Sequence, residues 1–151
     1  MKNIKNYSFL LLLTLIGIFS FSKITKSTTK KSGDNTKYVN TFIGTGGHGH
    51  TFPGATTPYG MVQLSPDTRT MGWDACGGYH YTDSSILGFS HTHLSGTGIS
   101  DLGDFLFMPF SGEANVNPGT PEDPDAGYRS RFNHDDEVSS PGFYSVLLKD
   151  Y

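Results

Sequence analysis

Histidine occurs in two i, i+2 pairs, His48 with His50 and His91 with His93, while His80 stands between two tyrosines. Residues two apart on a strand face the same side, so each pair could present two imidazole rings together. Three uses of these rings remain open: ligands of zinc or copper, the polar lining of a pocket, or hydrogen bonds to loop backbone. No acidic residue stands at the spacing of the zinc-protease motifs. We therefore assign no metal ligand to this chain.

Trp73 is the only tryptophan, and it stands next to Asp74 among glycines and other small residues. The face of an indole ring packs well against the C–H face of a pyranose, while neighbouring Asp and His side chains can bind its hydroxyls. Trp73 therefore predicts a sugar contact. A tryptophan in the hydrophobic core is the alternative.

Two short patterns resemble motifs of other functions, but the residues around them do not fit those motifs. GTGGHG at residues 44–49 fits the dinucleotide fingerprint, but Pro53 and Pro58 exclude the helix that must follow it. Ser90 lies in a GFSHT sequence that resembles a nucleophile elbow, but Thr92 replaces its second glycine. We expect a turning glycine loop without a nucleotide, and no serine hydrolase.

Short segments rich in aromatic and β-branched residues, bounded by Gly or Pro, predict strands; they lie at residues 38–44, 60–66, 77–83, 103–110 and 142–151. Residues 117–127 carry three prolines and predict a surface loop, and residues 131–140 predict a helical turn before Pro141. The pattern favours an all-β fold, an antiparallel β-sandwich or barrel. The last predicted strand runs to Tyr151, so we expect a sandwich that is incomplete at its C-terminal end.

The N-terminal residues predict export. Lys2 and Lys5 precede a short apolar run, which is typical of a signal peptide over residues 1–22, and a polar, basic lead-in follows at residues 23–37. We expect a periplasmic or extracellular protein with no membrane anchor after cleavage. A formal net charge of −3 does not suit a nucleic-acid binder. A single cysteine cannot form a disulfide within the chain.

Three long segments carry a family resemblance: YVNTFIGTGGHGHTFPGATTPYGMVQLSPDT, then GWDACGGYHYTDSSILGFSHTHLSGTGISDLGDFLFMPF, then RFNHDDEVSSPGFYSVLL. Together they resemble the N-terminal domain of glycoside hydrolase family 92, the exo-acting α-mannosidases abundant in Bacteroidetes. The likeness covers almost all of the chain after residue 37. It implies a supersandwich-like N-terminal β-domain, here partial over residues 38–151, packed against a larger C-terminal (α/α)6 barrel that this chain lacks.

The resemblance also implies a function. Family members are calcium-dependent, inverting enzymes that act on α-mannoside glycans such as N-glycans or mannans, and their active site lies between the two domains. The catalytic carboxylates and most calcium ligands come from the barrel, so we assign no catalytic residue to this chain. We expect Trp73, Asp74, His80, His91 and His93 to contact the substrate. A stand-alone carbohydrate-binding module, or an inactive fragment, is the alternative.

The 151-residue chain alone should release no mannose. An inverting glycosidase needs two carboxyl groups on opposite sides of the scissile bond, and the resemblance places both outside this chain. The measurement is hydrolysis of an aryl α-mannoside by the purified polypeptide in the presence of calcium. Turnover above that of a buffer blank would contradict the prediction.

Overall fold

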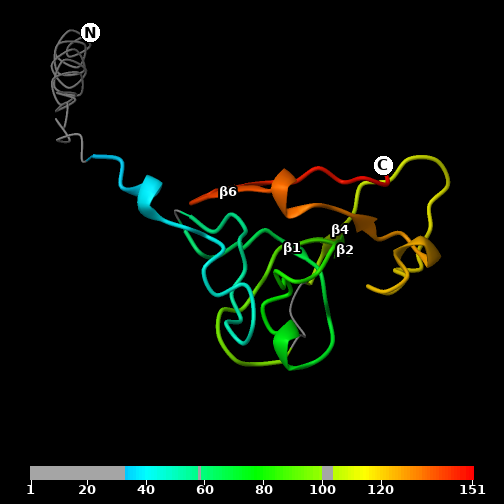
Figure 1. The fold of residues 1–151 in the computed structure, drawn as a ribbon, viewed down its shortest axis with the longest axis horizontal. Helices are drawn as coiled ribbons and strands as arrows, with labels where there is room; N and C mark the ends of the chain where they lie inside the picture. Colours follow the sequence, from blue (N-terminus) through cyan, green and yellow to red (C-terminus); the bar gives the residue numbers. More distant parts are fainter. Residues whose placement is uncertain (1–32, 58, 100–103) are drawn as a thin grey trace, which may run out of the picture. The chain divides into compact units, whose positions relative to one another are not determined.

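The computed structural model describes residues 33–57, 59–99 and 104–151 (Figure 1). The predicted signal peptide and most of the predicted lead-in lie outside these residues. Residues 34–151 form one compact unit. Within the described residues, no helix has the length and apolar character needed to cross a membrane.

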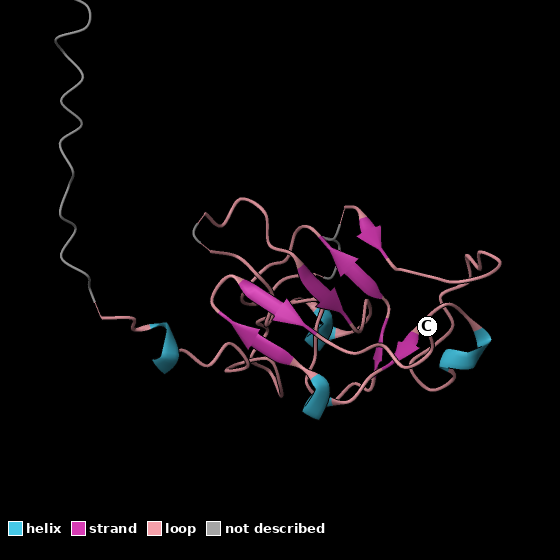
Figure 2. Ribbon diagram, turned by 90° about the horizontal axis from the view of Figure 1, so that it is seen from above, coloured by secondary structure: helices cyan, strands magenta, loops and turns pink. Residues whose placement is uncertain are grey.

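All strand pairings between described residues are antiparallel (Figure 2). One sheet has the order β1-β3-β4, and two further sheets pair β2 with β5 and β6 with β7. The strands are β1 (Ser65–Asp67), β2 (Ser85–Ile86), β3 (Gly88–Ser90), β4 (Leu106–Phe107), β5 (Ser130–Arg131), β6 (Val138–Ser140) and β7 (Phe143–Ser145). The predicted all-β, antiparallel, sandwich-like fold is confirmed.

The helical segments in the described part of the chain are single 3-10 turns: η1 (Thr36–Tyr38), η2 (Trp73–Ala75), η3 (Pro124–Ala126) and η4 (His134–Asp136). The predicted turn before Pro141 is η4. It begins after Asn133, whose side chain accepts a hydrogen bond from the Asp135 amide at 3.1 Å. Such a side-chain acceptor is the usual partner of the first free amides of a helical turn.

Two predicted strands, at residues 38–44 and 77–83, are wrong. Their backbone amides bond within local turns, as from Thr45 to Phe42 and from Asp83 to His80. Gly44 and Gly78 have φ values of 83° and 73°, which an extended strand cannot contain. The two short strands at residues 85–86 and 88–90 were not predicted, and β7 ends at Ser145 rather than continuing to the C-terminus.

The buried hydrophobic core is small. Tyr79, Ile86 and Phe132 form its centre, and the half-buried residues that pack against it are Phe42, Phe52, Phe89, Val146 and Leu148. These side chains come from the glycine-rich N-terminal loop, from the turn after η2, from β2 and β3, and from the segments that follow β5 and β7, so loops and strands share one core.

The hairpin of β6 and β7 is attached to the glycine-rich N-terminal loop. Ser139 in β6 accepts a hydrogen bond from the Thr41 hydroxyl at 2.6 Å and donates one to the Pro53 carbonyl at 2.6 Å. One serine thus connects two points of the loop to the sheet. These bonds restrict the loop that carries His48 and His50.

Glycine is required at position 78, where the chain leaves η2. A Cβ atom there would lie 2.3 Å from Asp67 Oδ1 and 2.9 Å from the His93 ring, in addition to the cost of a positive φ. The absence of a side chain lets this segment pack directly against β1. This close approach fixes the position of the neighbouring η2 turn.

Ile86→Ala should loosen the core locally. The Ile86 side chain has no solvent exposure, and such a truncation costs about 2–5 kcal/mol because it leaves a cavity. Hydrogen–deuterium exchange of peptides covering residues 79–90 should therefore become faster in the intact protein. Ile99→Ala is the matched control, since Ile99 is 71% exposed. Equal exchange in the two variants would contradict this account of the core.

Candidate sugar-contact site

Trp73 and Asp74 lie on η2, a turn that is held in place by the residues that follow Asp74. Ala75 is completely buried, and Cys76 Sγ lies 2.8 Å from both the Trp73 and Gly98 carbonyl oxygens. The turn begins after Gly72, at a φ of 89°. With its inner residues held in this way, the turn leaves the Trp73 side chain 61% exposed. Trp73 is therefore a surface residue, and the core alternative is wrong.

Two histidines from the glycine-rich loop converge on Asp74. His48 Nδ1 and His50 Nε2 donate hydrogen bonds to the same oxygen, Asp74 Oδ1, at 2.7 and 2.9 Å. The His48 side chain is 81% exposed, whereas that of His50 is 2% exposed. The His50 ring also meets the Trp73 indole edge to face, with centroids 5.6 Å apart. These contacts make His48, His50, Trp73 and Asp74 one group, here called the Trp73 group.

The electrostatics of the Trp73 group favour an ionised carboxylate. The hydrogen bond from His48 lowers the pKa of Asp74 most, and the bond from His50 lowers it further. Together they outweigh partial burial, which acts in the opposite direction. Asp74 therefore remains an acceptor-only group that holds both imidazoles.

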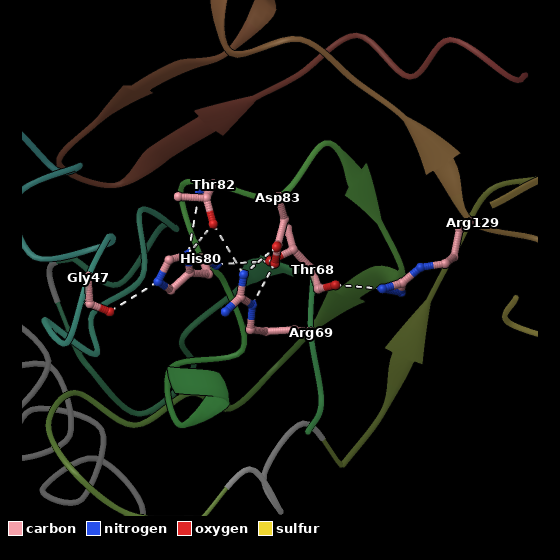
Figure 3. A network of polar contacts seen from close by, with 7 residues as sticks. All are labelled: Gly47, Thr68, Arg69, His80, Thr82, Asp83 and Arg129. Atoms are coloured by element: carbon pink, nitrogen blue, oxygen red, sulfur yellow. Dashed lines mark hydrogen bonds and ion pairs between the residues drawn. The ribbon is translucent and has the colours of Figure 1, made fainter. Parts of the chain in front are cut away.

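His80 lies beneath this loop and is buried. Its Nε2 donates to the Gly47 carbonyl at 3.0 Å, and Nδ1 lies 2.9 Å from the Thr82 hydroxyl, as Figure 3 shows. Both ring nitrogens therefore have partners within the protein. The hydrogen bond to Gly47 fixes the backbone next to His48, so His80 helps to position the Trp73 group.

A network of polar and charged groups extends from His80 through Thr68 (Figure 3). Arg69 donates two hydrogen bonds to the Asp83 carboxylate, one of them from Nε to Oδ2 at 2.8 Å. Burial would raise the pKa of Asp83, but the bonds from Arg69 and Thr68 outweigh it, and the pKa is lowered. Arg129 donates to the Thr68 carbonyl at 2.5 Å, and desolvation lowers the pKa of its guanidinium group.

His93 is buried and forms no catalytic triad with its neighbours. Its Nδ1 donates to the Gln63 carbonyl at 2.7 Å, while Nε2 faces both Asp67 Oδ1 at 3.0 Å and Ser90 Oγ at 3.2 Å. In a triad the carboxylate and the serine bind opposite nitrogens of the ring. Here the single nitrogen Nε2 faces both the carboxylate and the serine, and all three residues are buried.

His91 contacts a different part of the chain. Its Nδ1 donates to the Phe105 carbonyl at 2.9 Å, and its ring meets the rings of Phe105 and Phe107 edge to face. Of the five predicted contact residues, Trp73 and Asp74 thus share one exposed site, His80 supports it, His93 is buried elsewhere, and His91 faces β4.

Glu137 is a buried acid that sequence reasoning did not single out. Its side chain is fully buried and accepts hydrogen bonds from the hydroxyls of Tyr79 and Tyr144 and from His134 Nδ1. Burial and the nearby carboxylate raise the pKa of both tyrosines. The polar sequence around Glu137 gives no sign of this burial, because Tyr79 lies 58 residues away. The arrangement joins the β6–β7 hairpin to the core.

Comparison with known proteins identifies the family. Residues 38–151 match the glycosyl hydrolase family 92 N-terminal domain. The chain belongs to glycoside hydrolase family 92. A family GH92 α-mannosidase from Bacteroides thetaiotaomicron, solved alone and with mannoimidazole, is 57% identical, with a TM-score of 0.71 over 75% of this chain and 15% of that one.

Two further relatives are described as a glycosyl hydrolase and a glycosidase. The GH92 family glycosyl hydrolase CcMan5 is 37% identical, with a TM-score of 0.62 over 76% of this chain and 14% of its own. An uncharacterized secreted glycosidase of Arthroderma benhamiae is 31% identical over 131 residues, which are 84% of this chain and 16% of that protein. The chain therefore spans about one sixth of the length of its relatives.

The family 92 resemblance implies calcium, and the described residues do not fit it. Calcium takes six to eight oxygen ligands. Within the described ranges, the possible metal-ligating side chains that lie close to one another are His48, His50 and Asp74. They offer two nitrogens and one carboxylate. A calcium ion has no suitable donor set there.

Asp74 should titrate below the usual aspartate range of about 4, and His48→Ala should raise its pKa. The hydrogen bonds from His48 and His50 to the Asp74 carboxylate are thus kept as the pH falls through 4 and are lost below the lowered pKa of Asp74. The measurement is the pH dependence of the Asp74 carboxyl carbon shift by NMR. Asp34 is the internal control, because its pKa is lowered by Thr36 and not by a histidine. An unchanged Asp74 titration in His48→Ala would contradict the geometry.

Proposed function

We propose that this chain is the N-terminal part of an exported, calcium-dependent, inverting exo-α-mannosidase that acts on N-glycans or mannans. In this proposal it contributes sugar-contacting residues to an active site shared with a C-terminal (α/α)6 barrel. Support comes from the family 92 match and from the 57% identity to an α-mannosidase solved with mannoimidazole. Export is supported by the relative described as a secreted glycosidase.

The Trp73 group carries the proposal. Trp73 is 61% exposed, and an exposed indole is costly to leave in water and well suited to stack on the apolar face of a sugar ring. His50 contacts the indole and is itself bonded to Asp74, so the ring orientation is set before a ligand arrives. Such preorganisation reduces the entropy lost on binding.

The chain's own residues then bind and orient the substrate. Trp73 contacts the sugar face, and polar atoms of Asp74 and the exposed His48 lie within reach of hydroxyl groups beside it. The general acid and the general base of an inverting mechanism would come from the barrel. In this proposal calcium would hold sugar hydroxyls, and most of its ligands would come from the barrel.

Trp73→Ala in the intact enzyme should lower kcat/KM on an aryl α-mannoside about 10- to 100-fold, the equivalent of roughly 1.4–2.8 kcal/mol of lost sugar contact. Trp73→Phe should recover part of the loss because an aromatic face remains. Val116→Ala is the control, since Val116 is an apolar residue that is 91% exposed.

The outcomes separate the alternatives. Unchanged kcat/KM in Trp73→Ala would overturn the assignment of this residue to the sugar site. An intact protein that binds mannosides through Trp73 but never cleaves them would be a carbohydrate-binding module instead.

A further inference from the structure

His48, His50 and Asp74 bring three metal-ligating atoms together on two separate segments. His48 Nδ1, His50 Nε2 and an Asp74 carboxylate oxygen all lie within 4.8 Å of one another. The histidines belong to the glycine-rich loop and the aspartate to η2, 24 residues or more along the chain. We propose that these three residues bind a divalent transition-metal ion, Zn²⁺ in the first instance.

The donor set selects the type of metal. Two imidazole nitrogens and one carboxylate oxygen suit zinc and related first-row ions, whereas calcium and magnesium require oxygen ligands. Three protein ligands are also the usual number where a zinc ion retains one water. The donor set is therefore one for zinc and not one for calcium.

The geometry needs only a small adjustment. Ligand distances of about 2.0–2.2 Å in a tetrahedral zinc site place neighbouring ligand atoms about 3.4 Å apart. The two nitrogens now lie 2.7 and 2.9 Å from Asp74 Oδ1, so they must move away by about 0.7 and 0.5 Å respectively. His48 can do so because its side chain is 81% exposed.

The loop backbone holds the two histidines in place before an ion arrives. Gly49 and Thr51 donate backbone hydrogen bonds to Gly46 and Gly44, at 3.2 and 3.1 Å, and close the loop on itself. His50 has a φ of 53°, a conformation that is costly for a residue with a side chain. Such strain persists where the surroundings enforce it, and it is frequent at ligand sites.

A bound ion would also connect two separate segments of the chain. The one cysteine cannot form a disulfide within the chain, and in the described residues the buried core cluster consists of Tyr79, Ile86 and Phe132. Metals commonly supply the missing stability in domains with small cores. Here the ion would join the glycine-rich loop to the turn that presents Trp73.

The test is a Co²⁺ titration of the intact, chelator-treated protein, with calcium kept constant. One equivalent of Co²⁺ should give the visible absorption of a tetrahedral site, and Zn²⁺ should displace it. His48→Ala is the main variant because His48 is exposed, so its loss should not disturb folding. We expect His48→Ala and Asp74→Asn to weaken binding at least 10-fold. His91→Ala, which removes a histidine outside the cluster, should bind as the wild type does.

Two results would overturn the proposal: no Co²⁺ or Zn²⁺ binding by the wild-type protein, or equal binding by the wild type and His48→Ala. The readout is metal binding and not mannose release. A failure of the metal-site proposal would therefore be independent of any failure of the proposed mannosidase function.

Discussion

Thr68 is the residue on which the arrangement around the site depends. It is completely buried, and all of its polar groups are bonded. Its amide donates to the Gly78 carbonyl and its hydroxyl donates to Asp83, while the same hydroxyl accepts from the His80 amide and its carbonyl accepts from Arg129. One threonine thereby connects the end of β1 with the segment after η2 and with the approach to β5.

Polar contacts of this kind carry much of the organisation here because the hydrophobic core is small. In a low-dielectric interior, a fully bonded network specifies one arrangement, and a missing partner is costly. A series of hydrogen bonds runs from the Thr68 hydroxyl through His80 to the carbonyl of Gly47, the residue before His48. The exposed group around Trp73 is therefore positioned by buried hydrogen bonds more than by apolar packing.

The sequence was sufficient for the fold class, because short aromatic and β-branched segments bounded by Gly and Pro favour an all-β fold. It was insufficient for strand boundaries. Residues 38–44 have strand-like composition, yet the positive φ of Gly44 and local turn bonds prevent a strand. The meeting of His48 and His50 with Asp74 was likewise out of reach, since it depends on tertiary contact across 24 residues or more. The burial of Glu137 depends on Tyr79, which is more distant still, 58 residues away in sequence.

Cys76 adds a consequence for redox chemistry. Its thiol is 4% exposed and faces two carbonyl oxygens, so oxidants and thiol reagents cannot reach it while η2 is folded. In an oxidising compartment an exposed thiol at this position would risk mixed disulfides and covalent dimers, and the burial of Cys76 prevents both. The same thiol becomes reactive when the turn opens. Its alkylation rate is thus a direct measure of how often the turn that carries Trp73 unfolds.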